Sequence, residues 1–242
     1  LKLPWVLGAD LFYRNLLDGD PASNTCSWRW VAGLHTAGKT YLARPANIEE
    51  YTQGRFKPEG QLASTAVALE EADLGPRVQP TFDVPDLAGQ RIGLLLTPED
   101  CAADRLDPLP TPAGLFAWTE PVKRSVRPTA PAVDAFATQA VESAVTASEA
   151  RFGLSCVRAE ADEPTAEALA RWAQDLALDC IVTPRLPLGP TRKAVHAACS
   201  SQGLTLVEVT RPYDQAVWPH ARAGFFGLKK KIPAILASLS LA

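Results

Sequence analysis

Apolar residues recur at near-helical spacing at the start of the chain, which predicts a helix over residues 4–17. Four leucines form its stripe: Leu3, Leu7, Leu11 and Leu16. The sequence Asp18-Gly19-Asp20-Pro21 then ends this helix and begins another, because aspartate is a good N-cap and proline is tolerated at the first helical position. A second helix is predicted over residues 22–34, ending before Gly38.

Between residues 41 and 89 the pattern loses its period. The stretch "YLARPANIEEYTQGRF" (41–56) is expected to be loop with short helical turns, because its proline, asparagine and glycine are turn residues. Residues 61–89 carry three prolines and several acids, and they are predicted to form a linker or an irregular strap.

From residue 90 onward, short apolar runs alternate with longer helical spans. The predicted strands are 91–97, 114–119, 154–160, 179–185 and 204–210, and the predicted helices are 131–152, 165–177, 190–202 and 226–239. This alternation is typical of a parallel sheet with helical crossovers. We therefore expect two domains joined by the linker: a helical one over residues 1–60, and a doubly wound, Rossmann-like α/β domain over residues 90–242.

The composition is that of a globular protein, with 47% hydrophobic and 21% charged residues. No apolar run approaches the length of a membrane span, and no secretory signal is visible, so a cytoplasmic protein without a membrane partner is expected. The net charge is −3, which lacks the basic excess of a general nucleic-acid binder. Any contact with DNA must therefore come from a local arrangement of charge or from parts outside this sequence.

The cysteines are five, an odd number, with no C-x-x-C pair. They are expected to be reduced thiols, buried or half-buried, and not metal ligands. The chain contains no methionine and begins Leu-Lys-Leu-Pro-Trp, so we expect a fragment that starts inside a folded unit. Nothing in the pattern indicates an oligomeric state.

Helix geometry places the polar and aromatic residues that follow Pro21 on different faces of the predicted helix. Asn24 and Trp28 lie four residues apart and share one face, whereas Trp30 is rotated from Trp28 by roughly 200°. The helix N-terminus gathers backbone N–H groups and the positive end of the macrodipole, so a planar, electron-rich ligand lying there would meet donors, acceptors and an amide in a small area. The alternative is structural: a capping aspartate, a surface amide and two core tryptophans.

The order of these residues resembles the closing segment of the FAD-binding domain of DNA photolyases and cryptochromes. The stretches that carry the likeness are "LPW", "LLDGDPASNTCSWRW" and "YLARPANI" with a trailing "GRF". Eight positions match the family pattern at fixed spacing: Trp5, Asp18, Gly19, Asp20, Ala22, Asn24, Trp28 and Trp30. Residues 44–56, "RPANIEEYTQGRF", look more like a bacterial cryptochrome-like subgroup than like the familiar repair enzymes.

The resemblance implies FAD as the cofactor and a role for each matched residue. Asp18, Gly19 and Asp20 would lie at the flavin and fix its orientation. Asn24 would face the ring edge near N5. Trp28 and then Trp5 would pass electrons to the photoexcited flavin.

Trp30 would lie at the rim of a substrate cavity and stack on a flipped base. The sequence departs from the family at Thr25-Cys26-Ser27, where many repair enzymes are glycine-rich, and at Arg29. The arginine that usually partners the first aspartate is missing, together with the upstream part of the family domain.

Three functions stay open. The first is an enzyme of the deoxyribodipyrimidine photo-lyase type, in which light-excited reduced FAD donates an electron to pyrimidine dimers in DNA, a partner of the full-length protein. The second is a cryptochrome-like blue-light receptor without repair activity. The third is a degenerate, non-catalytic paralogue whose α/β domain does the binding.

The α/β region carries no catalytic motif. The first turn after Gly189 contains Arg192 and Lys193, which allows an anion site there, although a routine strand-to-helix turn capped by Thr191 is the favoured interpretation. The run 229–231 of three lysines is expected to be a solvated helix face. His196 is expected on a helix face and His220 in a loop.

Overall fold

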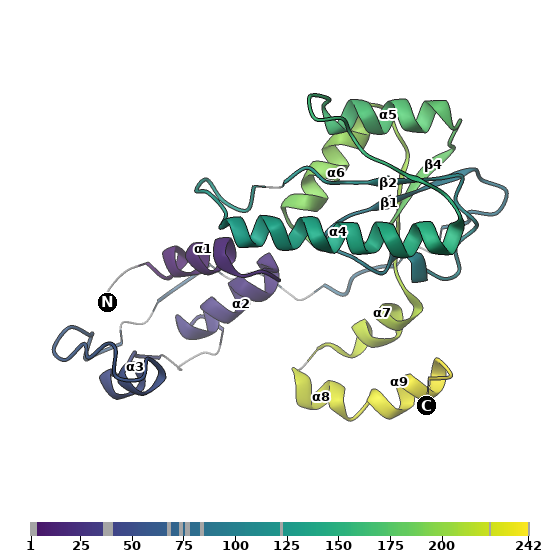
Figure 1. The fold of residues 1–242 in the computed structure, drawn as a ribbon. Helices are drawn as coiled ribbons and strands as arrows, with labels where there is room; N and C mark the ends of the chain where they lie inside the picture. Colours follow the sequence, from purple (N-terminus) through teal and green to yellow (C-terminus); the bar gives the residue numbers. More distant parts are fainter. Residues whose placement is uncertain are drawn as a thin grey trace. The chain divides into compact units, whose positions relative to one another are not determined.

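The computed structural model describes residues 4–35, 41–66, 69–72, 75, 78–82, 85–121, 123–222 and 224–241. The chain forms two compact units (Figure 1). The first unit combines Leu1–Pro76 with Lys123–Val133, and the second combines Arg77–Val122 with Asp134–Ala242. Among the described residues, no helix is long and apolar enough to cross a membrane.

The second unit is built on a five-stranded parallel sheet with the strand order β3-β2-β1-β4-β5. The strands are β1 (Ile92–Leu96), β2 (Gly114–Ala117), β3 (Cys156–Val157), β4 (Cys180–Pro184) and β5 (Leu206–Val209). The first, second and fourth strands are buried along their whole length, which explains their apolar sequence; Thr183 of the fourth is the exception, and its hydroxyl donates to Leu95 O (3.1 Å). The parallel sheet that the sequence predicts is confirmed.

Helices cover both faces of this sheet. They are α4 (Pro131–Phe152), α5 (Thr165–Asp175) and α6 (Pro190–Ser201). Figure 1 shows α5 and α6 on one side of β1 and β2 and α4 on the other. The core agrees, because Leu95 packs with residues of α5 and α6 while its neighbours Leu94 and Leu96 pack with residues of α4. Alternate side chains point to opposite faces of a strand, so the unit is doubly wound.

The indole of Trp172 lies on two glycines of neighbouring strands. Gly93 and Gly114 are paired in the β1–β2 register, and a Cβ atom on either one would collide with the Trp172 ring. Trp172 is only 3% exposed and also contacts Phe116 with ring centroids 5.4 Å apart. The two glycines therefore form the bare patch of sheet on which α5 seats its largest side chain.

Two predicted elements of the second unit are wrong in extent. The edge strand β3 spans only Cys156–Val157 where residues 154–160 were expected, because β2 offers it only Leu115 and Phe116 as partners. The single helix expected over residues 226–239 is two helices, α8 (Phe225–Lys229) and α9 (Ile232–Ser238). Pro233 lies in the first turn of α9, and a proline there cannot continue a preceding helix.

Two short elements after β5 were not predicted. They are α7 (Pro212–Val217) and the 3-10 helix η2 (Trp218–His220). Both have a proline at their first turn, a position where the missing N–H costs nothing. His220 thus ends a 3-10 turn, whereas His196 lies in α6 as expected.

The first unit contains three helices, α1 (Trp5–Asn15), α2 (Pro21–Val31) and α3 (Pro45–Tyr51). The first two were predicted, and the third replaces the expected loop with short turns. α2 ends at Val31 and not at Leu34, because Gly33 adopts a positive φ of 83° and closes a helix C-cap. The Leu34 N–H donates to Arg29 O (2.9 Å) and the Gly33 N–H to Trp30 O (3.2 Å), as in a Schellman motif. Gly38, the expected stop, lies outside the described residues.

α1 packs on α2 through a different face from the predicted leucine stripe. Leu7, Leu11 and Leu16 are exposed, whereas Ala9 is buried. Gly8 is the reason, because its missing side chain lets α1 approach an indole of α2. Between α3 and β1, the described residues form neither helix nor strand.

Candidate functional site

One cavity of the first unit has a volume of about 580 Å³, within the usual range of small-molecule sites (about 300–1,000 Å³). Its walls come from the end of α1, the turn that follows and one face of α2. The lining residues are Phe12, Leu16, Asp18, Gly19, Asp20, Ser23, Asn24, Ser27, Trp28 and Val31. Five of the residues singled out in the sequence thus meet in one concavity: Asp18, Gly19, Asp20, Asn24 and Trp28.

The N-terminus of α2 is built as its sequence indicates. Asp20 is the N-cap, and its Oδ1 accepts a hydrogen bond from the Ser23 backbone N–H (2.6 Å), while Pro21 opens the first turn. This bond satisfies one of the backbone donors that every helix leaves free at its start. Asp20 therefore fixes the position at which α2 begins, and with it the direction of Asn24 and Trp28.

Replacing Asp20 with alanine is expected to lower the free energy of unfolding of the first unit by about 1 kcal/mol, the usual cost of losing an N-cap. Asp20→Asn keeps the cap, because asparagine caps about as well as aspartate, but it removes the charge. Thermal unfolding followed by circular dichroism compares the two variants. Equal losses in both variants would show that the cap is not the source of the effect.

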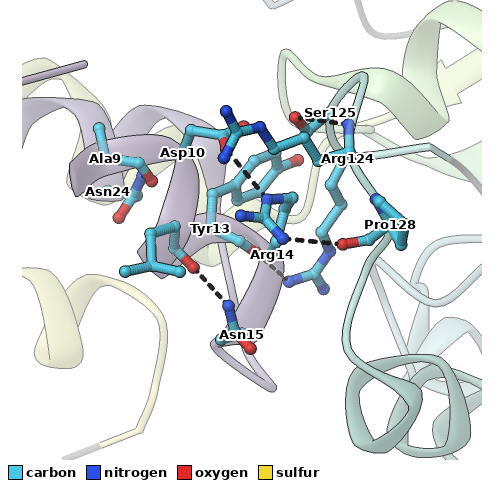
Figure 2. Close-up of polar contacts among 11 residues, drawn as sticks. Ala9, Asp10, Tyr13, Arg14, Asn15, Asn24, Arg124, Ser125 and Pro128 are labelled. Atoms are coloured by element: carbon cyan, nitrogen blue, oxygen red, sulfur yellow. Dashed lines mark hydrogen bonds and ion pairs between the residues drawn. The ribbon is translucent and has the colours of Figure 1, made fainter. Parts of the chain in front are cut away.

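Asn24 joins the two helices at the cavity wall. Its Nδ2 donates to Ala9 O of α1 (2.9 Å), and Figure 2 shows the two residues side by side. A backbone carbonyl can only accept, so this bond settles which end of the amide is nitrogen. The Asn24 oxygen and the second N–H of the amide are then the groups that Asn24 can offer to a ligand, and the oxygen can bind only a donor.

Trp28 is clamped between α1 and the cavity. Its ring packs edge-on against Phe12, with centroids 5.1 Å apart and an interplanar angle of 76°. On its other side the six-membered ring lies against Gly8, where any Cβ atom would overlap it. Trp28 is half-buried and lines the cavity, so one part of the indole faces a bound ligand while the rest is held in place.

The other two matched tryptophans do not line the cavity. Trp30 faces away from Trp28, as the helical period predicts; its ring lies 4.1 Å from that of Tyr41 and it is 45% exposed. Trp5 is the half-buried first residue of α1. Arg29, which departs from the family pattern, is paired with Glu71.

A connection from far along the sequence is fastened to α1. Arg14 Nη1 donates to Pro128 O (2.9 Å), and the Ala130 N–H donates to Arg14 O (2.9 Å). Arg124 binds carbonyl groups at the end of α1, beside the cavity (Figure 2). We call residues 123–133 the strap. Sequence reasoning missed it, since its only signals are three basic residues in a proline-containing connection between β2 and α4.

The strap contact should be sensitive to acid through Asp10. The hydroxyl of Ser125 and the guanidinium of Arg14 hold the pKa of Asp10 below its ordinary value of 3.8. A lowered pKa means that the carboxylate stabilises the fold above 3.8, and that this contribution is lost as the pH falls through the folded-state pKa. In urea unfolding at a series of pH values, Asp10→Asn should be less stable than the wild type at neutral pH and equal to it in strong acid. A constant difference at all pH values would contradict this assignment.

The cavity suits the ring and ribityl hydroxyls of FAD better than its phosphates. Phe12, Leu16, Trp28 and Val31 offer apolar surface, whereas the turn and the start of α2 offer carboxylates, hydroxyls and an amide. Among the described lining residues none carries a positive charge, so the pyrophosphate needs other residues. The polar edge would meet hydroxyl and ring N–H groups of a bound flavin, and the apolar wall would meet the faces of its ring.

In the second unit, the polar side chains that were considered for an anion site bind one another. Arg192 binds Glu208 through two hydrogen bonds of 3.0 Å, and His196 Nε2 contacts the same carboxylate at 2.9 Å. Burial raises the pKa of Glu208, but these two partners outweigh it and leave that pKa lowered. Thr191 donates to Glu99 (2.5 Å), so a carboxylate already occupies the first turn of α6. The alternative of an anion site there is therefore not supported.

The cysteines only partly follow expectation. All five are free, but Cys26 and Cys101 are exposed, so the expected burial is wrong for these two. Burial raises the pKa of Cys156 to about 12 and that of Cys199 to about 11. In the described part of the chain, no three His, Cys, Asp or Glu side chains come together as a metal site would require.

Comparison with known families gives a match in the cavity-bearing unit. Residues 1–67 match the family model for the FAD binding domain of DNA photolyase. Searches of curated proteins and of solved structures returned no match. All ten described residues that line the cavity fall within the matched segment. Residues 1–67 are therefore similar to the FAD-binding domain of DNA photolyases, which supports a flavoprotein of the photolyase/cryptochrome family and indicates FAD as its cofactor.

Proposed function

We propose that this chain carries part of the flavin site of a photolyase-type flavoprotein, which transfers an electron from light-excited reduced FAD to pyrimidine dimers in DNA. One observation carries the proposal. Within a single cavity the structure gathers two carboxylates, an amide and an indole whose spacing also matches the family segment: Asp18, Asp20, Asn24 and Trp28.

The carboxylates and the amide are proposed to orient the cofactor. Asp18 and Asp20 accept hydrogen bonds from ribityl hydroxyl or ring N–H groups, and Gly19 between them leaves the turn narrow. Asn24, whose nitrogen is held by Ala9 O, presents an oxygen to the ring edge near N5. An oxygen at that place favours a ring nitrogen that carries a proton over one that does not.

Trp28 is proposed to be the electron donor nearest the ring, followed by Trp5. Bound FAD supplies the light absorption and the redox chemistry. The protein contributes the contact of the indole with the cavity and its fixed orientation between Gly8 and Phe12. A rigid donor keeps a constant distance to the ring, which electron transfer requires.

Replacing Trp28 with phenylalanine is expected to slow blue-light photoreduction of the flavin by about tenfold or more without releasing it. Phenylalanine keeps an aromatic wall, so the loss of FAD affinity should stay within the small effect of one contact, roughly tenfold or less. Trp30→Phe is the matched control, because Trp30 lies on the same helix but outside the cavity. Equal photoreduction rates in wild type and Trp28→Phe would exclude the proposed relay.

A blue-light receptor without repair activity is the second candidate function, and the position of Trp30 favours it. Tyr41 packs against one face of the Trp30 ring, so only the other face is left to stack on a flipped base, although the side chain is 45% exposed. Irradiated DNA should be mixed with the protein expressed from its full coding sequence and exposed to blue light. Loss of pyrimidine dimers supports repair, whereas photoreduction of bound flavin with no loss of dimers supports the receptor.

A further inference from the structure

The strap holds the end of α1 through Arg124. Its Nη1 donates to Tyr13 O (2.9 Å) and Leu16 O (2.7 Å), and its Nη2 donates to Leu17 O (3.3 Å). The last carbonyl groups of a helix have no partner within it and carry partial negative charge, so a guanidinium is well suited to bind them. The guanidinium also lies over the Tyr13 ring, 5.2 Å from its centroid.

These carbonyls belong to the turn that carries the cavity acids. Leu16 lines the cavity, and its carbonyl accepts both from Arg124 and from the Gly19 N–H (3.2 Å). One side chain therefore ties together the end of α1 and the residue that separates Asp18 from Asp20. Movement of Arg124 would release the turn at the point where it enters the cavity wall.

Gly19 makes room for this guanidinium. A Cβ atom at residue 19 would lie 2.5 Å from Arg124 Nη1 and 3.2 Å from both Leu16 O and Tyr13 O. The backbone of Gly19 does not need a positive φ, so glycine is required here by the close approach and not by its conformation. The glycine of the Asp-Gly-Asp sequence and an arginine about a hundred residues later thus fit one another.

Further bonds keep the strap in place. Arg14 spans from Asp10 (3.0 Å) to Pro128 O (2.9 Å), and the Ala130 N–H returns to Arg14 O. The strap is therefore anchored on the C-terminal side of Arg124, at Ser125 beside Asp10 and at residues 128–130. Such an anchored side chain can position a turn, because its own rotamer is fixed by its surroundings.

We infer that Arg124, which lies outside the segment matched to the photolyase family, is a positioning residue of the candidate flavin site: it holds the Leu16–Gly19 turn so that Asp18 and Asp20 face the ring. The inference rests on the proposed function. It implies that residues 1–67 do not complete the site alone, and that the strap, which belongs to the first unit although it follows β2 in the chain, supplies the missing support.

The test compares Arg124→Gln, Gly19→Ala and the double variant in the full chain, with Arg127→Gln as control. Arg127 lies in the same strap and loses the same charge, but its side chain is exposed. Hydrogen exchange of the Gly19 amide in the ligand-free protein reports the turn itself. FAD titration and the visible circular dichroism of bound flavin report the site.

Arg124→Gln is expected to raise exchange at Gly19, to weaken FAD binding about tenfold and to change the flavin dichroism, since bonds to a charged donor are lost. Gly19→Ala should do the same by displacing the guanidinium. The double variant should bind FAD no more weakly than the single variant with the lower affinity, because both substitutions act through one contact. Arg127→Gln should match the wild type.

Additive losses in the double variant, or unchanged exchange and dichroism in Arg124→Gln, would overturn the inference. If the wild type binds no FAD, the proposed function fails by itself. Exchange at Gly19 then still decides whether Arg124 holds the turn.

Discussion

Gly8→Ala is expected to weaken FAD binding about tenfold and to destabilise the first unit by about 1–3 kcal/mol, the usual cost of overpacking. The reason is the Trp28 ring, which occupies the space of the missing Gly8 side chain. Helix propensity alone predicts the opposite sign, since alanine is better than glycine in a helix by about 1 kcal/mol. The sign of the measured change therefore distinguishes the two effects. Urea unfolding and FAD titration give the two quantities.

The double variant Gly8→Ala/Trp28→Phe serves as the control. The atoms that meet Gly8 belong to the six-membered ring of the indole, which phenylalanine lacks at that reach. Relief of the clash should make the double variant more stable than Gly8→Ala. If Gly8→Ala is more stable than the wild type and binds FAD equally well, the clamped position of Trp28 is wrong.

Trp172→Ala is expected to lower the free energy of unfolding of the second unit by about 3–5 kcal/mol, as other large aromatic truncations in cores do. The indole fills the space over Gly93 and Gly114 together with the Leu176 and Leu178 side chains that border it, and the glycines have no side chain of their own to replace the indole. The cavity would therefore stay open. Urea unfolding followed by far-ultraviolet circular dichroism measures the loss.

Two control variants give reference values for the loss of stability in Trp172→Ala. Trp172→Phe keeps most of the ring and removes an indole N–H that has no partner among the described residues, so its loss should be much smaller. Phe226→Ala removes an aromatic ring that is 79% exposed, and its effect should stay within about 0.5 kcal/mol. A loss for Trp172→Ala as small as that for Phe226→Ala would contradict the described core.

The sequence predicts the parallel sheet well because burial on both faces leaves a plain signal. β1 is an unbroken apolar run, β4 is apolar except for Thr183, and α-helices separate β2 from β3, β3 from β4 and β4 from β5. Prediction fails where a boundary depends on a single contact. Gly33 ends α2 through backbone bonds that no apolar pattern contains, and the edge strand β3 pairs only at Cys156 and Val157 although β2 is four residues long.

The cavity also combines features that the sequence predicts with features that it does not. The N-cap at Asp20 and the shared face of Asn24 and Trp28 follow from rules that act within one helix, so sequence reasoning finds them. Gly8 and Arg124 act on residues from another helix or a distant segment. Their partners are 20 and more than 100 positions away, a separation over which local patterns carry no information.

Photolabelling with an azido-substituted FAD tests the central claim most directly, because it locates the ring on the chain. The protein expressed from its full coding sequence is irradiated with the probe, digested, and analysed by mass spectrometry, with unlabelled FAD as competitor. We expect competed labels on peptides that cover residues 12–31, the walls of the cavity. Competed labels confined to residues 90–242 would place the flavin elsewhere and contradict the account.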